Sequence, residues 1–531
     1  MPSGSFPFAS YRNGQREALD AARDAFAEGK RFVIVEAPTG SGKSAIAVAL
    51  AREAGSSYVL TAQKVLQEQY TRDFPELALM KGRSNYPCLV APTHAAAAPC
   101  IAGRRFPPAC DDCPYFVAKD VAMAASSAAL NYAYYLAELN YAGGFRQREL
   151  LVLDEAHNAE GALMGFVQVT LGEGWLARAG IERRLPAPLG TDAYFDFAED
   201  LVPELIERGR ALDLELRTED LPDTAALSRL QTKQWLDGQL ARLELLVGSR
   251  NDDGVEWVVE RRHTRAGEAL AFKPVEVAPF AEPLLFHGHE RVLMLSATVL
   301  DAVTFLRGLG IGPDDAAVIR TPSIFPPENR PLVLLPTTRL TRHHLAAGLP
   351  KLVEAIAELC DRHAEEKGII HAHSYKIAQA IERGLPREHA RRLVTHHDAS
   401  ERDAALNAHL ESDEPTILLS PSMTEGIDLV EDLARWQVLC KIPYPYLGDP
   451  QVARRMELDD GWYDWRTCLS VVQAYGRSVR SEDDYAVTYL LDADFPAYLR
   501  RQRGRFPEWF LEAIQQDGSE RSAPGAGRTG A

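Results

Sequence analysis

Short apolar runs alternate with longer amphipathic stretches along much of the chain. In the second half, four runs rich in Val, Ile and Leu are separated by segments whose apolar residues recur at helical spacing. Each run has the length of a buried strand, and strands that alternate with helices build parallel sheets. This half of the chain therefore predicts an α/β domain. The four runs are residues 368–374, 416–422, 437–443 and 486–492.

The first half shows the same alternation with two interruptions. Apolar runs at Phe32–Val35 and Leu150–Leu153 are typical of strands in a second parallel sheet. Between them, residues 82–128 carry four cysteines in a stretch that otherwise has the composition of a loop. From 161 to 286 the chain offers helical stretches and two strand-like runs, with no catalytic constellation. These two stretches thus stand apart from the alternation of strands and helices in the rest of the chain.

Composition narrows the class of protein. The 531 residues are 46% hydrophobic and 25% charged, which suits several ordinary domains, and no run approaches the roughly 18 apolar residues of a membrane span. We expect a cytoplasmic protein, in which clustered cysteines bind metal more often than they form disulfides. The net charge of −17 argues mildly against a general polyanion binder. Acidic residues are concentrated between Glu160 and Glu290, so a local basic groove elsewhere can still bind nucleic acid.

A phosphate-binding loop follows the first predicted strand. The segment APTGSGKS contains Gly40 and Gly42 and leads into an Ala-rich helix. Backbone N–H groups of such a loop bind phosphates at the helix N-terminus, Lys43 reaches the terminal phosphates, and the Ser44 hydroxyl binds Mg²⁺. The loop departs from the strict G-x-x-x-x-G-K-[ST] pattern, because Ala37 stands at its first position.

An acid pair follows the second strand. In the segment DEAH, Asp154 and Glu155 stand where the carboxyl end of a parallel strand opens onto a nucleotide crevice. We expect Asp154 to bind Mg²⁺ and Glu155 to orient and deprotonate the attacking water. Two acids at a helix start are also favoured by the helix dipole alone, but the phosphate loop upstream favours the catalytic interpretation.

The motifs together resemble a known family. APTGSGKS, DEAH, RVLMLSATVL and VVQAYGRSVR occur in the order found in superfamily two helicases, and the cysteine segment follows the phrase KGRSNYPC. Over residues 11–492 the chain resembles the XPD/DinG group of iron–sulfur helicases. The resemblance implies an α/β fold with two RecA-like parallel-sheet motor domains. It also implies that an iron–sulfur domain and a mainly helical Arch domain interrupt the first of them.

The resemblance also implies roles for individual residues. YRNGQREAL is similar to the family's adenine-recognition element, with Arg12 and Gln15 as its polar readers. The motif Q-x-x-G-R-x-x-R presents Gln473, Arg477 and Arg480 at helical spacing, and guanidinium groups from a second domain stabilise a phosphoryl transition state only while the domains are closed. Further implied residues are Asp428 for the nucleotide, Ser296, Ala297 and Thr298 for coupling hydrolysis to strand movement, and Thr61, Gln67, Lys81 and Arg83 for DNA.

Four of the seven cysteines follow the spacing C-x11-C-x9-C-x2-C. Four thiolates suit either zinc or an iron–sulfur cluster, and the spacing alone does not choose between them. The resemblance implies one [4Fe–4S] cluster on Cys88, Cys100, Cys110 and Cys113, with His94 as an alternative ligand. The other three cysteines stand in apolar contexts and are predicted to lie in the core: Cys360, Cys440 and Cys468.

We interpret the sequence as that of a monomeric, ATP- and Mg²⁺-dependent DNA helicase. Its expected partners are single-stranded and fork DNA, and no membrane association is expected. The resemblance implies 5′ to 3′ movement and an iron–sulfur domain at the duplex fork. Two alternatives stay open: a zinc-stabilised nucleic-acid-dependent ATPase that translocates without unwinding, and an RNA helicase. The predicted domains are motor domain 1 (1–81, 129–160, and 287–330 with the linker), the iron–sulfur domain (82–128), an Arch-like domain (161–286), motor domain 2 (331–512) and a disordered tail (513–531).

Overall fold

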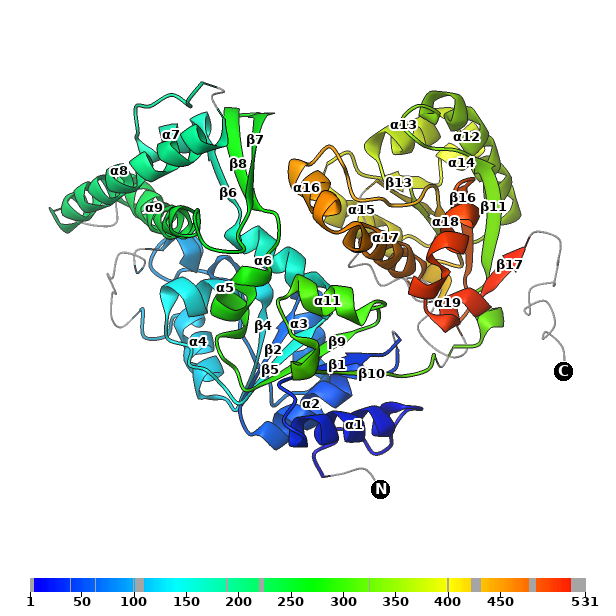
Figure 1. Ribbon diagram of the computed structural model, residues 1–531, viewed down its shortest axis with the longest axis horizontal. Coiled ribbons are helices and arrows are strands. Elements are labelled where there is room, and N and C mark those ends of the chain that lie inside the picture. Colours follow the sequence, from blue (N-terminus) through cyan, green and yellow to red (C-terminus); the bar gives the residue numbers. More distant parts are fainter. Residues whose placement is uncertain are drawn as a thin grey trace.

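Two parallel sheets and one small antiparallel sheet organise the protein (Figure 1). Both parallel sheets have seven strands, and the antiparallel sheet has three. None of the described helices combines the length and apolarity needed to cross a bilayer. The computed structural model describes residues 4–38, 40–62, 64–98, 100, 109–187, 190–218, 224–323, 325–398, 401–421, 431–476 and 484–516.

The first sheet is buried on both faces. Alternate residues of β1 face opposite sides: Val33 and Val35 lie in one core with helices α1 (Gln15–Ala27) and α2 (Lys43–Ala54), and Phe32 and Ile34 lie in the core on the other face. A strand covered on both faces requires a continuous apolar run, which is the pattern of β1. The strand order is β10 (Ala316–Arg320), β1 (Phe32–Glu36), β9 (Arg291–Ser296), β5 (Leu150–Asp154), β2 (Ser57–Thr61), β4 (Ser127–Asn131) and β3 (Ala78–Leu79).

Two long segments leave this sheet and return to it. The cysteine-bearing segment lies between β3 and β4 and contains two short 3₁₀ turns, at Arg83–Asn85 and Ala95–Ala97, and helix α4 (Pro114–Ala124). The second segment, between β5 and β9, contains the long helices α8 (Thr191–Thr218) and α9 (Thr224–Gly248). Its remaining described elements are a 3₁₀ turn (Ala156–Asn158), α6 (Ala159–Val167), β6 (Val169–Gly172), α7 (Glu173–Ala179), β7 (Trp257–Thr264), β8 (Gly267–Pro274), α10 (Ala278–Ala281) and a π-turn (Glu282–Phe286). The two predicted interruptions are therefore present, and the longer one adds an antiparallel sheet, β6-β8-β7, to its helices.

The second sheet contains the four strands predicted from apolar runs. Its order is β13 (Leu393–Thr395), β14 (Ile417–Ser420), β12 (Gly368–His371), β15 (Trp436–Leu439), β16 (Val487–Asp492), β11 (Leu332–Thr338) and β17 (Ile514–Gln516). Strand β17 lies beyond the boundary that we set at residue 512, because buried Phe510 and Ala513 carry the chain back to the edge strand β11. The helices are α12 (Leu345–Arg362), α13 (Tyr375–Gly384), α14 (Arg387–Ala390), α15 (Arg402–Glu411), α16 (Pro450–Leu458), α17 (Asp460–Tyr475), α18 (Phe495–Gln502) and α19 (Glu508–Glu512).

Helices α16 and α17 join the second sheet's domain to the part of the chain that precedes that domain (Figure 1). From α17, Trp465 Nε1 donates to the carbonyl of Val299 at 2.8 Å. From α16, Gln451 Nε2 donates to the carbonyl of Val275 at 2.7 Å. Ion pairs add to this interface between residues far apart in sequence: Arg455 with Glu160, Arg454 with Glu256, Lys273 with Asp449, and Arg307 with Asp459.

Candidate functional site

The phosphate loop joins β1 to α2 at the carboxyl edge of the first sheet. Gly40 and Gly42 both have φ of +80°, a conformation that glycine adopts without strain. A Cβ atom on Gly42 would lie 2.1 Å from Gln15 Nε2, so a side chain there would displace the Gln15 amide. Both glycines are thus favoured by the backbone conformation, and Gly42 also by its close contact with α1.

The predicted adenine readers contact this loop directly. Gln15 Nε2 donates to the carbonyl of Gly42 at 2.9 Å, and Gln15 Oε1 accepts from the backbone N–H of Arg12 at 2.8 Å. The Arg12 guanidinium donates to the carbonyl of Gly40. Because Gln15 is only 3% exposed and both ends of its amide are bonded, these side chains brace the loop in this conformation.

Lys43 begins α2 with its ammonium turned into the loop. Its Nζ donates to the carbonyl of Ala37 at 3.1 Å and lies 3.5 Å from that of Pro38. Helix α2 places the backbone N–H groups of its first turn at the same point, where they favour anions. The loop therefore has the charge and the donors that a polyphosphate requires.

A tyrosine that the sequence reasoning missed connects the two predicted Mg²⁺ ligands. The hydroxyl of Tyr70 on α3 (Lys64–Asp73) donates to Asp154 Oδ2 at 3.0 Å, and it also hydrogen-bonds with Ser44. Burial and the Asp154 charge raise the pKa of Tyr70 well above its usual value, so this group stays protonated. No sequence pattern points to this role, because a tyrosine on an amphipathic helix is usually a packing residue.

The acid pair sits at the end of β5. Burial, and then the charge of Glu155, raise the pKa of Asp154 to about 6, while Lys43 and the Tyr70 hydroxyl oppose the shift. A metal cation would favour the ionised carboxylate. Glu155 has φ of 49°, a left-handed conformation that is strained for glutamate and is typical of functional sites.

A series of side-chain contacts runs from Glu155 to the second domain. Glu155 Oε2 lies 3.3 Å from His157 Nδ1, which lies 2.9 Å from the Ser296 hydroxyl at the end of β9. The Ser296 hydroxyl donates to the carbonyl of Thr298 at 2.9 Å. The Thr298 hydroxyl accepts from the Gln473 amide on α17. The structure therefore brings together the acid pair, the SAT segment and Gln473.

For the other predicted site residues, the structure does not decide the predicted role. Arg477, Arg480 and Asp428 lie outside the described residues. Thr61 and Gln67 are fully buried, and Gln67 Nε2 donates to the carbonyl of Met80 at 3.3 Å. Neither therefore presents its side chain to DNA in this conformation, and their predicted contacts with DNA stay untested.

Lys81 and Arg83 lie between β3 and the cysteines. Lys81 forms an ion pair with Glu68, and the Arg83 guanidinium lies 4.7 Å from the ring centroid of Tyr115. Both cations are thus held close to the cysteine-bearing segment, and their predicted role in DNA binding also stays untested.

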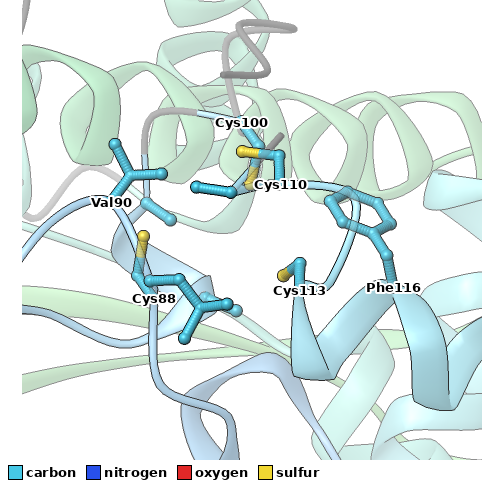
Figure 2. A pocket seen from close by; sticks show the side chains of 10 residues that line it. Cys88, Val90, Cys100, Cys110, Cys113 and Phe116 are labelled. Carbon is cyan, nitrogen blue, oxygen red and sulfur yellow. The ribbon is translucent and has the colours of Figure 1, made fainter. Parts of the chain in front are cut away.

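The four clustered cysteines line one pocket (Figure 2). Burial raises the pKa of the Cys100 thiol, with smaller contributions from the other three thiols, while Arg83 opposes the shift. The rest of the lining is mostly apolar and includes Phe116. Within the described part of the chain, no group of three or more Cys, His, Asp or Glu residues has metal-binding geometry. As a donor set, four thiols that line one mostly apolar pocket fit a Cys₄ metal or cluster.

The remaining cysteine-related predictions have clear outcomes. Cys360, Cys440 and Cys468 are fully buried in the core of the second domain, as predicted. His94 is exposed and does not line the pocket, so it is not placed as an alternative ligand.

Comparisons with known proteins agree with this architecture. The family model of the type III restriction enzyme res subunit matches residues 9–171, and that of the helicase C-terminal domain matches residues 356–513. A Caenorhabditis elegans regulator of telomere elongation helicase 1 homolog is 28% identical over 114 residues, 18% of this chain and 11% of that protein. The ATP-dependent DNA helicase CHL1 of Candida albicans is 31% identical over 110 residues, 17% of this chain and 13% of that protein. The matched region thus spans only a small part of either relative.

Solved structures match over nearly the whole chain. An XPD helicase superposes with a TM-score of 0.65 at 14% identity and covers 96% of this chain and 100% of its own. Xpd4 of S. tokodaii gives 0.60 at 15% identity, with 95% and 100% covered. At this identity the likeness establishes the fold, and with the family models it defines a two-domain helicase motor. Within that class, the chain resembles the XPD/DinG-like helicases of superfamily two.

Proposed function

We propose that this protein is an ATP-dependent DNA helicase that moves 5′ to 3′ along single-stranded DNA and separates strands at a duplex fork. The observation that carries the proposal is the series of contacts from Glu155 through His157, Ser296 and Thr298 to Gln473. Such a series joins a nucleotide site in one domain to a helix of another. A change at the phosphate can thereby bias the position of the second domain.

The residues at the phosphate loop have separate tasks. Lys43 would exchange its loop carbonyls for the terminal phosphates, and Ser44 and Asp154 would hold Mg²⁺ once the Tyr70 hydroxyl turns aside. Glu155 would orient the attacking water and accept its proton. Arg477 and Arg480 are proposed to reach the transferred phosphoryl group from the second domain.

The cysteine pocket would hold a [4Fe–4S] cluster on Cys88, Cys100, Cys110 and Cys113. When bound, such a cluster supplies a rigid cross-link to a segment with little regular structure of its own. The protein's own contribution is to keep the Arg83 guanidinium against Tyr115 and Lys81 against Glu68 beside it. Cations fixed on a rigid segment suit contact with DNA phosphates at a fork.

Strand displacement tests the function directly. The protein should release a labelled strand from a duplex with a 5′ single-stranded tail, only with ATP and Mg²⁺, and far less from a duplex with a 3′ tail. ATPase activity without strand release on either substrate would favour the non-unwinding translocase. Stronger ATPase stimulation by RNA than by single-stranded DNA would favour an RNA helicase. Iron and sulfide near four per chain would support the cluster, and one zinc without sulfide would contradict it.

A further inference from the structure

Helix α4 begins directly after one of the four clustered cysteines. Cys113 precedes Pro114, the first residue of the helix, and the Cys113 carbonyl accepts from the Val117 N–H at 2.9 Å (Figure 2). The Cys113 N–H in turn donates to the carbonyl of Cys110 at 3.4 Å. Both thiols line the cysteine pocket. Their positions therefore depend on where α4 is held.

A buried carboxylate holds α4 against motor domain 1. Glu138 is 3% exposed and begins the π-turn Glu138–Ala142, which follows helix α5 (Tyr132–Ala137). Its Oε1 accepts from the Tyr115 hydroxyl at 3.1 Å, and its Oε2 accepts from Lys119 Nζ at 2.6 Å. Tyr115 and Lys119 lie one turn apart on α4, so a single carboxylate bonds to two points on the same face of that helix.

The surroundings of Glu138 make these bonds costly to break. Tyr115 is fully buried, and its hydroxyl lies 3.1 Å from that of Tyr134. Because Tyr115 donates to Glu138, the Tyr134 hydroxyl donates to Tyr115. The Lys119 side chain is mostly buried, and its Nζ lies 5.6 Å from the ring centroid of Phe145. Removing the carboxylate would therefore leave a buried ammonium without its counter-charge.

Motor domain 1 supplies a fixed base for Glu138. From α5, the Tyr132 hydroxyl donates to the carbonyl of Asp154 at the end of β5, at 3.1 Å. The Tyr135 hydroxyl donates to the carbonyl of Leu285 in the segment that returns to β9, also at 3.1 Å. Both tyrosines are buried in the core of this domain. The end of α5, where Glu138 stands, is therefore fixed by contacts that do not involve the cysteine segment.

The Tyr115 ring also contacts the first part of the cysteine segment. It packs edge to face on Tyr86, with the ring centroids 5.7 Å apart, and Tyr86 lies two residues before Cys88. The Arg83 guanidinium lies 4.7 Å from the centroid of the same ring. The bond from Tyr115 to Glu138 thus bears on both ends of the cysteine segment.

We propose that Glu138 is a positioning residue for the metal site: through Tyr115 and Lys119 it fixes α4, and thereby holds the Cys110 and Cys113 thiols at the pocket. The proposal rests on the proposed function and deepens it, because it names a residue outside the cysteine segment on which metal binding depends. Glu138 itself touches neither the metal nor the nucleotide in this role.

Retention of metal by the full-length protein tests the proposal. Wild type, Glu138→Gln and Tyr115→Phe would be purified without oxygen and incubated with EDTA, and the metal left on the protein would be followed by elemental analysis. Glu138→Gln should lose metal about tenfold faster than the wild type, and Tyr115→Phe about three- to fivefold faster, because it loses one hydrogen bond and keeps its ring. Asp120→Asn, an exposed carboxylate on the same helix, should match the wild type.

Cobalt gives a spectroscopic signature that general destabilisation would not change. Co²⁺ titrated into the metal-free full-length protein shows thiolate-to-metal charge-transfer absorption, whose intensity per bound ion reports how many thiolates are ligands. Glu138→Gln should bind Co²⁺ about tenfold more weakly and with lower intensity per ion. Adding Lys119→Met to Glu138→Gln should restore part of the affinity, because no buried ammonium then lacks its carboxylate.

Two results would overturn the proposal: metal retention and Co²⁺ affinity equal to the wild type in both variants, or a lower temperature of thermal unfolding with unchanged metal binding. Neither measurement needs strand separation. A wild type that binds metal on the four thiols without unwinding DNA would contradict the proposed function and leave the comparison between variants intact. A wild type that binds neither iron, zinc nor Co²⁺ would contradict both.

Discussion

The nucleotide site and the cysteine pocket are assembled in different ways. At the nucleotide site, neighbouring parallel strands bring Asp154 and Ser296 to one sheet edge, and hydrogen bonds fix both side chains. In the cysteine segment, two 3₁₀ turns and one helix arrange four thiols around a pocket. Hydrogen bonds within the protein thus hold the side chains of the first site in place, whereas under the proposed function a bound cluster would do so in the second.

The nucleotide site and the cysteine segment differ in what keeps their side chains in place. The strands that end at Asp154 and Ser296 are buried on both faces, so their positions follow from the core. The cysteine segment places exposed apolar residues on its surface, among them Leu89 and Val117, and contributes little core of its own. We therefore expect damage to the motor to abolish chemistry without unfolding, and damage to the pocket to loosen one segment while chemistry continues.

We expect the largest loss of activity from a substitution at the nucleotide site. Lys43→Ala should lower the DNA-stimulated ATPase rate at least about 10²- to 10³-fold, because no other cation begins α2 at the terminal phosphates. Thermal unfolding should stay close to the wild type. Lys351→Ala, on the exposed side of α12, is the control and should retain full activity. Near-normal turnover by Lys43→Ala would contradict the site.

Removing one thiol tests whether the cysteine segment depends on a bound ligand. Cys110→Ala should lose the bound metal and strand displacement while keeping much of the ATPase activity, and proteolysis should become faster between Cys88 and Cys113. Iron analysis, strand displacement and limited proteolysis measure the three effects. Cys360→Ala, in the core of the second domain, should keep its iron. Full strand displacement by Cys110→Ala would show that the segment needs no ligand.

The same difference explains what could be predicted from the sequence. The strand–loop–helix of the phosphate loop and the four strands of the second sheet follow from local patterns, and all of them are confirmed. Tyr70 was missed because its role depends on a contact with Asp154, 84 positions away. The bonds of Arg12 and Gln15 to the phosphate loop could not be read from the sequence, because no periodicity carries that information, and their role toward the base stays a prediction.

A buried ion pair between α16 and α6 tests how much protein contacts contribute to the stability of the motor. Arg455 is 2% exposed, pairs with Glu160 across the interface and lies 4.4 Å from the ring centroid of Trp462. Arg455→Ala should lower the free energy of unfolding by about 3–5 kcal/mol in urea titrations, because it leaves Glu160 unpaired. Its neighbour Arg454, in an exposed pair with Glu256, is the matched control, and Arg454→Ala should change stability little.

The raised pKa of Asp154 predicts that the stability of the fold depends on pH. Because the pKa of Asp154 is raised to about 6, the folded protein binds an extra proton between about pH 4 and pH 6. Without Mg²⁺, this carboxyl should therefore destabilise the fold progressively as the pH rises through that interval, by up to about 3 kcal/mol. Asp154→Asn should remove the contribution, and Asp237→Asn, in an exposed helical pair, should not. Equal pH profiles for wild type and Asp154→Asn would contradict the assignment.

The smallest expected effect concerns the contact between the two motor domains. Thr298→Val removes the hydroxyl that accepts from the Gln473 amide and leaves the volume of the side chain almost unchanged. Loss of one hydrogen bond costs about 1 kcal/mol, so the ratio of DNA-stimulated to basal ATPase should fall about fivefold. Because the two residues would act through one contact, the double variant with Gln473→Ala should be no worse than Gln473→Ala alone. Additive losses would show that Gln473 acts independently of Thr298, and the path from Glu155 to α17 would then need another connection.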